Sequence, residues 1–414
     1  MRRLALILAL NLLAAAMYGV VALQMGFFSH MAETLFWSPD SHSYREVADW
    51  LFRAIPSSPE SLHRPFLYPL LLGTADRLGG APGIWFLNFV FWLGTLNLTA
   101  AATWRLTGRA LLAVIVFLIM ALNVSLIALS FQALTELTVA FLESIWILAL
   151  ASTKWPPARP RDIAILLTPL ALLTVVKPQY QLEIAIALLL LAAVIWRMPQ
   201  GRAPSAIALV ACLAPIAFQL GLNAVANHFV GLSSTGSLEV KGYYVSQVYA
   251  SINGLPDDLV AARQVVNDWT TSQVASFLLQ HPEPAARTLI ANLHYNLTSG
   301  SAFVDPAKTP LLATVVQDTN RVFYRLHFVF LPVVALAIWR RRDVRLLLLY
   351  AFAAALILTS SLIYDQGDRY VEMAIPFWAV AYALAVSDLW PDLARSLTHL
   401  RLTRPSDLSP RPGR

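Results

Sequence analysis

The sequence is poor in charge and almost free of cysteine. Charged residues make up 13% of its 414 positions, whereas hydrophobic residues make up 57%. A soluble domain carries roughly 25% charged residues, so this chain lacks the polar surface needed to cover itself in water. A soluble enzyme of this length is therefore excluded.

The single cysteine, Cys212, lies within an apolar stretch. No intramolecular disulfide and no thiolate metal site can therefore form. The histidines include no pair with the spacing of a helical metal motif. The formal net charge of +6 could suggest nucleic acid, but the lysines and arginines form short clusters between apolar stretches. That arrangement is typical of charge that sets membrane topology, and we expect no nucleic-acid partner.

The apolar residues form nearly uncharged stretches of roughly 18 to 24 residues, the length of a helix that crosses the hydrocarbon of a bilayer. The first stretch, from Leu4 to Phe28, follows Arg2 and Arg3 as in a secretory signal. It is long, however, and lacks a clear small-residue cleavage site. We expect it to be retained as the first membrane span.

Basic clusters predict the number of crossings. If every cluster is cytoplasmic, the chain between two consecutive clusters must cross the membrane an even number of times. The sequence then predicts an all-α polytopic membrane protein with about ten spans and with both termini in the cytoplasm. The clusters are Arg2/Arg3, Arg105/Arg109, Lys154/Arg159/Arg161, Arg197/Arg202, Arg340/Arg341/Arg342/Arg345 and the tail from Arg395 to Arg414.

Three pairs of predicted spans are separated by polar outer turns, which lie at Glu136, at Lys177 and at residues 364–370. The apolar segment Pro65–Ala75 would make an odd crossing and is short, so we expect it to be interfacial or re-entrant. The ten predicted spans are 4–28, 82–104, two within 110–152, two within 163–196, 204–226, 322–339 and two within 344–388.

This pattern divides the chain into four parts. Residues 1–226 form an N-terminal transmembrane module whose first outer loop is 28–81. Residues 227–321 form an outer, periplasmic helical segment, which could be a lid over a site or a packing cap over the spans. Residues 322–390 form a C-terminal transmembrane module, and residues 391–414 form a basic cytoplasmic tail with the composition of a disordered segment.

The first outer loop contains an amphipathic helix. Ser43 and Glu46 have the spacing of a capping box, and apolar residues then recur at helical positions as far as Phe52. We expect this helix to lie along the membrane surface, with Asp40 just ahead of its start. The basic residue that heads the next apolar segment is Arg64, at the depth of lipid headgroups.

An acid after the first span, a tyrosine four positions later and a basic-Pro-x-x-Tyr-Pro motif resemble the first loop of the GT-C superfamily of membrane glycosyltransferases. These residues are Asp40, Tyr44 and the segment Arg64–Pro69. The pattern is most similar to the polyprenyl-phosphate-dependent group that includes protein O-mannosyltransferases and lipid A aminoarabinose transferases. Other motifs similar to the family's are Leu134-Thr135-Glu136, Val176-Lys177-Pro178 and Asp368-Arg369-Tyr370 running to Pro376-Phe377.

The resemblance implies a GT-C-like bundle and an inverting glycosyltransferase. Its donor would be a polyprenyl-phosphate-linked sugar, and its acceptor a glycolipid, glycan or protein at the outer face of a bacterial inner membrane. Asp40 would be the catalytic base, and Arg64, Lys177 and Arg369 would bind the donor phosphate. The substrate-pocket candidates are Tyr44, Tyr68, Glu136 and Asp368.

Other interpretations stay open. Many members of the family have two adjacent acids in this loop, whereas Asp40 is followed by Ser41, so a divalent metal cofactor is neither implied nor excluded. Asp40 could cap a helix, and the tyrosines could be interfacial anchors. The chain could also be a lipid-glycan ligase or polymerase of another fold, or a lipid or sugar transporter or flippase. The transporter is disfavoured because the sequence shows no two related halves.

Overall fold

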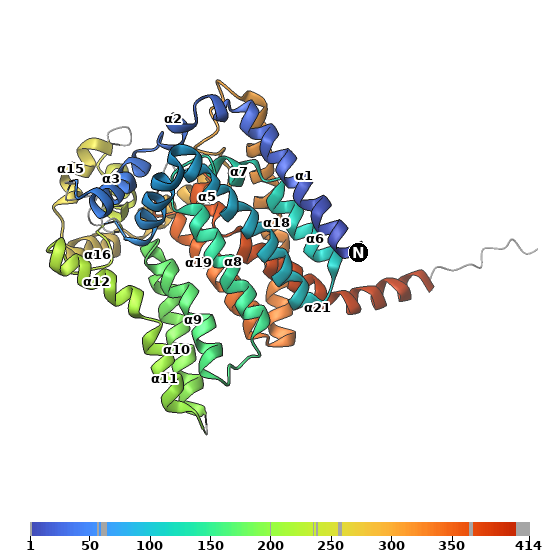
Figure 1. The fold of residues 1–414 in the computed structure, drawn as a ribbon. Helices are drawn as coiled ribbons and strands as arrows, with labels where there is room; N and C mark the ends of the chain where they lie inside the picture. The colour runs from blue at the N-terminus through green and yellow to red at the C-terminus, as the bar shows by residue number, and fades with distance from the viewer. Residues whose placement is uncertain are drawn as a thin grey trace, which may run out of the picture.

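Helices make up the regular structure of this protein. The computed structural model describes residues 2–55, 58, 64–198, 200–234, 236, 239–255, 259–363 and 367–402. Within these ranges no β-strand forms, and one isolated bridge joins Ser301 to Gly367. The predicted all-α class is therefore confirmed (Figure 1).

Several helices are long and apolar enough to cross a membrane. Two bent neighbours, α11 (Arg202–Ala211) and α12 (Ala214–Ala226), would add another span if their 41° bend lies within one crossing. These helices agree with a membrane protein, whereas the count of ten spans stays a prediction. The four span candidates in the described ranges are α1 (Arg2–Gln24), α5 (Leu67–Thr107), η2 (Pro178–Tyr180) with α10 (Gln181–Arg197), and α18 (Pro310–Arg341).

The predicted outer turns fall at helix boundaries. Glu136 is the first residue of α8, and Lys177 lies directly before η2, where Pro178 removes a helix hydrogen bond. Of the turn at 364–370, residues 364–366 lie outside the described ranges. The apolar helices around these turns are α6 (Ala110–Ala121), α7 (Val124–Leu129), α8 (Glu136–Ser152), α9 (Pro160–Thr174), α19 (Val344–Ser360), α20 (Arg369–Glu372) and α21 (Ile375–Leu402).

The amphipathic helix of the first loop is present, but it begins earlier than the sequence predicts. After η1 (Phe27–Ser29) and α2 (Met31–Leu35), helix α3 runs from Pro39 to Arg53, with proline at its first position. Proline is favoured there because its fixed φ suits a helix start. Asp40 therefore lies in the first turn of α3 and not ahead of it, and the predicted capping pair lies inside the helix.

The segment Pro65–Ala75 does not stand alone. Its residues from Leu67 onward form the first limb of α5, which bends at Gly80 (φ 59°, ψ −144°) just before Pro82. The two limbs of α5 approach each other closely at this bend: a Cβ added at Gly83 would lie 2.3 Å from the carbonyl oxygen of Ala75. The first limb of about 13 residues spans roughly 20 Å, which is too short to cross a bilayer.

The outer segment consists of short helices with a small core of their own. Tyr244, Val245, Val248, Val266 and Ala285 form that core. The helices are the π-helix η3 (Val240–Val245), α14 (Ser246–Ile252), α15 (Leu259–Asn267), α16 (Thr271–Gln280) and α17 (Pro282–Thr298).

Two boundaries of the C-terminal module differ from the prediction. Helix α18 begins at Pro310, twelve residues before the predicted span, because proline is favoured at the first position of a helix. Residues 391–402 continue α21 and do not form a separate irregular tail. Residues 403–414 lie outside the described ranges.

Packing places the starts of several helices together. Helix α5 packs against α3, α6 and α8, while α8 packs against α9 and α21 (Figure 1). Between α5 and α8, Thr99 and Ser144 share a hydrogen bond of 2.9 Å, and the small Gly94 lets Phe141 approach its backbone. Small and hydroxyl residues are typical of helix contacts in membranes. This tight packing fixes the position of Glu136.

Candidate active site

Arg369 is the centre of a buried ionic network. Its Nη1 atom lies 2.8 Å from Oδ2 of Asp40, and its Nε atom lies 2.7 Å from Oε1 of Glu136. Asp40 comes from the first turn of α3, Glu136 from the start of α8 and Arg369 from the start of α20. The side chains of Arg369 and Glu136 are 5% and 1% exposed, so their interaction is poorly screened by water.

Two further cations complete the network. Arg64 donates from Nη2 to Oδ1 of Asp40 at 2.7 Å, and Lys177 donates from Nζ to Oε1 of Glu136 at 3.0 Å. Three cations therefore surround two carboxylates, which leaves one net positive charge. A positively charged, partly desolvated cluster of this kind is suited to binding an anion.

The network keeps Asp40 ionised. Burial raises the pKa of this carboxyl, but the charges of Arg369 and Arg64 outweigh burial and lower the pKa from 3.8 to about 2. Both carboxylate oxygens accept a hydrogen bond from an arginine. Asp40 is therefore a weak base for as long as both arginines hold it.

Tyr44 and Tyr68 pack beside this network. The Arg64 guanidinium lies 4.9 Å from the centre of the Tyr44 ring, and the two tyrosine rings meet edge to face at 5.0 Å. Both side chains are buried, at 5% and 0% exposure. Tyr44 contacts Arg64, Tyr68 packs against Tyr44, and neither lines the cavity described below.

Asp368 is not part of the network, although it precedes Arg369. Its Oδ2 atom accepts hydrogen bonds from Ser125 of α7 and, at 2.8 Å, from Asn320 of α18. The side chain is 2% exposed and faces the packed helices. These contacts hold the start of α20, and thus Arg369, in position.

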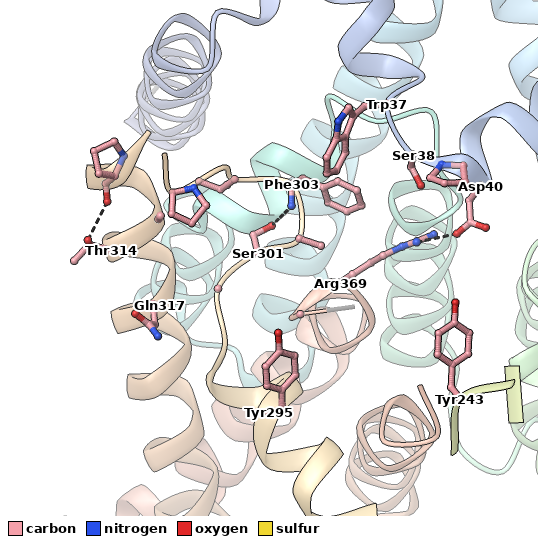
Figure 2. A pocket seen from close by; sticks show the side chains of 18 residues that line it. Trp37, Ser38, Asp40, Tyr243, Tyr295, Ser301, Phe303, Thr314, Gln317 and Arg369 are labelled. Atoms are coloured by element: carbon pink, nitrogen blue, oxygen red, sulfur yellow. Dashed lines mark hydrogen bonds and ion pairs between the residues drawn. The ribbon is translucent and has the colours of Figure 1, made fainter. Parts of the chain in front are cut away.

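A cavity of about 770 Å³ lies on the Arg369 side of Asp40. Figure 2 shows the paired Asp40 and Arg369 on one wall and Thr314 and Gln317 of α18 on the opposite wall. Its volume is in the range of small-molecule binding sites. Other lining side chains include Trp37, Tyr243, Tyr295, Ser301 and Phe303.

Glu239, which sequence reasoning missed, faces the network from the outer segment. Burial raises the pKa of its carboxyl, and the nearby charges of Lys177 and Arg64 lower it in part. Glu239 directly precedes η3, which contributes Tyr243 to the cavity. No short motif surrounds Glu239 in the sequence, so only the fold places it at the site.

The carboxylates do not fit a divalent metal ion. Oxygen atoms of Asp40 and Glu136 are the ligands that such an ion would need, but they accept hydrogen bonds from Arg64, Arg369 and Lys177. In the described part of the chain, no group of three His, Cys, Asp or Glu residues is placed to hold a metal. The three cations are thus the counter-charges of these carboxylates.

No protein-family model and no curated protein matches this sequence. Among solved structures, the chain is similar to the apo form of the Archaeoglobus fulgidus oligosaccharyltransferase, with a TM-score of 0.41 and 14% identity. The similarity covers 94% of this chain and 52% of that one, so the chain spans about half the length of that protein.

The structure therefore brings together five of the eight residues selected from the sequence. Asp40, Arg64, Glu136, Lys177 and Arg369 form one network. Of the other three, Tyr44 packs against Arg64 and Tyr68 packs against Tyr44. Asp368 is hydrogen-bonded outside the network.

Proposed function

We propose that this protein is an inverting glycosyltransferase that takes a sugar from a polyprenyl-phosphate donor at the outer face of a bacterial inner membrane. The observation that carries the proposal is the network itself. Three cations from distant parts of the chain, Arg64, Lys177 and Arg369, surround two carboxylates, and two members of the network, Asp40 and Arg369, line a cavity of substrate size.

The chemistry needs a cationic site for the leaving phosphate and a base for the acceptor. In the proposed step, the acceptor hydroxyl gives its proton to Asp40 while its oxygen bonds to the anomeric carbon. The bond between that carbon and the phosphate oxygen breaks, and the phosphate leaves with the electron pair. Arg64 and Lys177 stabilise the negative charge that develops, and attack opposite the leaving group inverts the configuration.

The charges imply an order of binding. A donor phosphate competes with the Asp40 carboxylate for the guanidinium of Arg64 and draws that cation away. Because Arg64 helps to lower the pKa of Asp40 to about 2, its withdrawal raises that pKa and makes the carboxylate a better base. Donor binding thus activates Asp40 for the acceptor.

A lipid-linked donor suits the surroundings of Arg64. The next residues are Pro65 and Phe66, and the Phe66 ring packs against Phe218 of α12 at 4.8 Å. Phe218 is 57% exposed on an apolar helix, where a lipid chain can lie against it. A phosphate at Arg64 would therefore have its hydrocarbon beside α12 while the sugar points towards Asp40.

Replacing Asp40 tests the proposed function. We expect Asp40→Asn to lower the rate of sugar transfer by roughly 100-fold or more, the scale of a lost general base. The reason is that the amide cannot take a proton. The matched control is Asp49→Asn on the same helix, whose carboxylate pairs with Arg53 at 3.2 Å away from the network. Mass spectrometry of glycolipids, surface glycans and glycoproteins from cells producing each variant measures the product. Full product formation by Asp40→Asn would overturn the proposal.

A further inference from the structure

A second cavity, of about 380 Å³, lies among α17, α18, α19 and α21 and is separate from the network. Its walls include Leu297 of α17, Phe328 and Leu331 of α18, and Ile357 of α19. The polar atoms of His327 and Tyr382 at this cavity hydrogen-bond to each other, with Nδ1 and the hydroxyl oxygen 2.6 Å apart. The rest of the lining is largely apolar and suits a hydrocarbon chain. The other lining residues whose side chains carry polar atoms are His294, Tyr324, Tyr350 and Trp378.

The apolar cavity lies at membrane depth. Asp318, Arg321 and Arg325 of α18 are exposed, whereas residues 326–339 contain no Asp, Glu, Lys or Arg. This change lies at the outer end of the predicted span 322–339, where Arg325 can extend its guanidinium towards the headgroups. Phe328 and Leu331, which are 62% and 48% exposed, lie on the hydrocarbon side, so the apolar cavity opens towards lipid chains.

One face of α18 connects the apolar cavity to the cavity beside Asp40. Residues three or four apart share a helix face, and the distance along the axis from Gln317 to Leu331 is about 21 Å. At the junction, the rings of His294 and Tyr324 are 5.3 Å apart, at the depth where polar aromatic residues meet headgroups. In order along this face lie Ala313, Gln317, Asn320, Tyr324, Phe328 and Leu331.

We propose that the acceptor is a membrane lipid with a headgroup hydroxyl. The headgroup enters the cavity beside Asp40, and one hydrocarbon chain lies in the apolar cavity. This inference rests on the proposed function and names its acceptor class. We assign this hydrocarbon chain to the acceptor and not to the donor. The cavity beside Asp40 lies on the Arg369 side of that residue, whereas Arg64 faces the separate apolar surface at Phe66.

The test fills the apolar cavity without touching the network. Ala354 of α19 lines it, whereas the next residue, Ala355, does not, and both side chains are partly exposed. Lipid extracts are prepared from cells producing the wild-type chain, Ala354→Phe, Ala355→Phe or Asp40→Asn, and are compared by mass spectrometry. We expect a lipid that gains one sugar in the wild type and in Ala355→Phe. We expect its amount to fall about tenfold in Ala354→Phe, the scale on which a hydrophobic site rejects a misfit.

A second pair of variants guards against misfolding. Leu331→Trp fills the same cavity from α18, whereas the exposed Val329 lies outside it and serves as Val329→Trp. The purified full-length variants are also irradiated in bilayers that contain a phospholipid with a diazirine in its acyl chain. We expect adducts on Tyr382, which lines the cavity and is only 7% exposed, in the wild type and in Asp40→Asn, and their loss in Leu331→Trp but not in Val329→Trp.

The outcomes separate the two proposals. If Asp40→Asn still forms the product, the proposed function is wrong. If Asp40→Asn is inactive but the sugar appears on protein or on a water-soluble glycan, the lipid acceptor is wrong and the transferase stands. The same conclusion follows if the variants that fill the cavity match their controls in both product and adducts.

Discussion

At the scale of single residues, the free-energy cost of removing the ions of the network from water bears on what the network does. Each ion removed from water loses several kcal/mol of hydration, which pairing repays only in part. Glu136 and Arg369 are nevertheless buried, and Asp40 and Lys177 are partly buried beside them, where apolar side chains would be cheaper. Ionisable residues held in this way within a membrane protein mark functional sites. This cost supports the proposed role of the network in stabilising charge during a reaction.

Arg64 should control the pH dependence of Asp40. The pKa of Asp40 is lowered to about 2, so its carboxylate is ionised well above that pH and becomes protonated as the pH falls through it. Arg64→Gln removes one positive charge, so this pKa rises in the donor-free enzyme. We expect the acidic limb of kcat/KM for the donor, which reports the free enzyme, to move to higher pH.

The control for this prediction is Arg53→Gln, at the end of α3, whose partners are Asp49 and Asp76. Its acidic limb should match that of the wild type. An unchanged acidic limb in Arg64→Gln would show that Asp40 does not determine this limb.

The sequence predicts five residues of the network because they lie near polar turns between apolar stretches and within motifs that resemble those of the GT-C superfamily. Counting crossings placed Glu136, Lys177 and Arg369 on the same face as the first loop. Their pairing could not be predicted, because Asp40 and Arg369 are far apart in the chain and the fold alone sets their distance. Glu239 lies in a segment rich in Gly and Ser, where no periodicity predicts a position.

At the scale of elements, helix starts assemble the site. Asp40 lies in the first turn of α3 and Glu136 begins α8. A carboxylate at a helix N-terminus is stabilised by the helix dipole. The sequence predicted the break before Pro178 because proline is a strong signal. It did not predict that α3 begins at Pro39, since the capping pair at Ser43 gave a competing local signal.

The bend in α5 should be sensitive to a single methyl group. A Cβ at Gly83 would lie 2.3 Å from the carbonyl oxygen of Ala75, whereas a Cβ at Gly79 would meet no atom within 4 Å. We expect Gly83→Ala to destabilise the protein by about 1–3 kcal/mol, because backbone must move to relieve the overlap. Gly79→Ala should be neutral or slightly stabilising, since alanine favours helix over glycine.

Thermal unfolding of both variants in one detergent measures this difference. Because the first limb of α5 carries Tyr68 beside the network, Gly83→Ala should also reduce sugar transfer more than Gly79→Ala. Equal unfolding temperatures for the two variants would contradict the fold-back of α5 at Gly80.

At the scale of the whole molecule, the ionic network and the basic clusters of the sequence lie at opposite ends of the helices. Helix α8 runs from Glu136 in the network to Ser152 beside the basic cluster that begins at Lys154, about 25 Å in all. Other basic clusters gather at that far end. Arg105 donates a hydrogen bond to Ser152, and the Arg109 guanidinium lies 5.9 Å from the Trp390 ring of α21.

This arrangement predicts which end faces the cytoplasm. The basic end should be inside and the network outside, with α16 at the outer face.

Two exposed serines, each replaced by cysteine, test this orientation: Ser152→Cys at the basic end and Ser276→Cys on α16. The native thiol, Cys212, is buried and is first replaced by alanine. In spheroplasts, a membrane-impermeant maleimide should label Cys at position 276 at once and position 152 only after lysis. The reverse pattern would place the network in the cytoplasm and exclude transfer at the outer face, whereas labelling of both positions before lysis would contradict the crossing of α8.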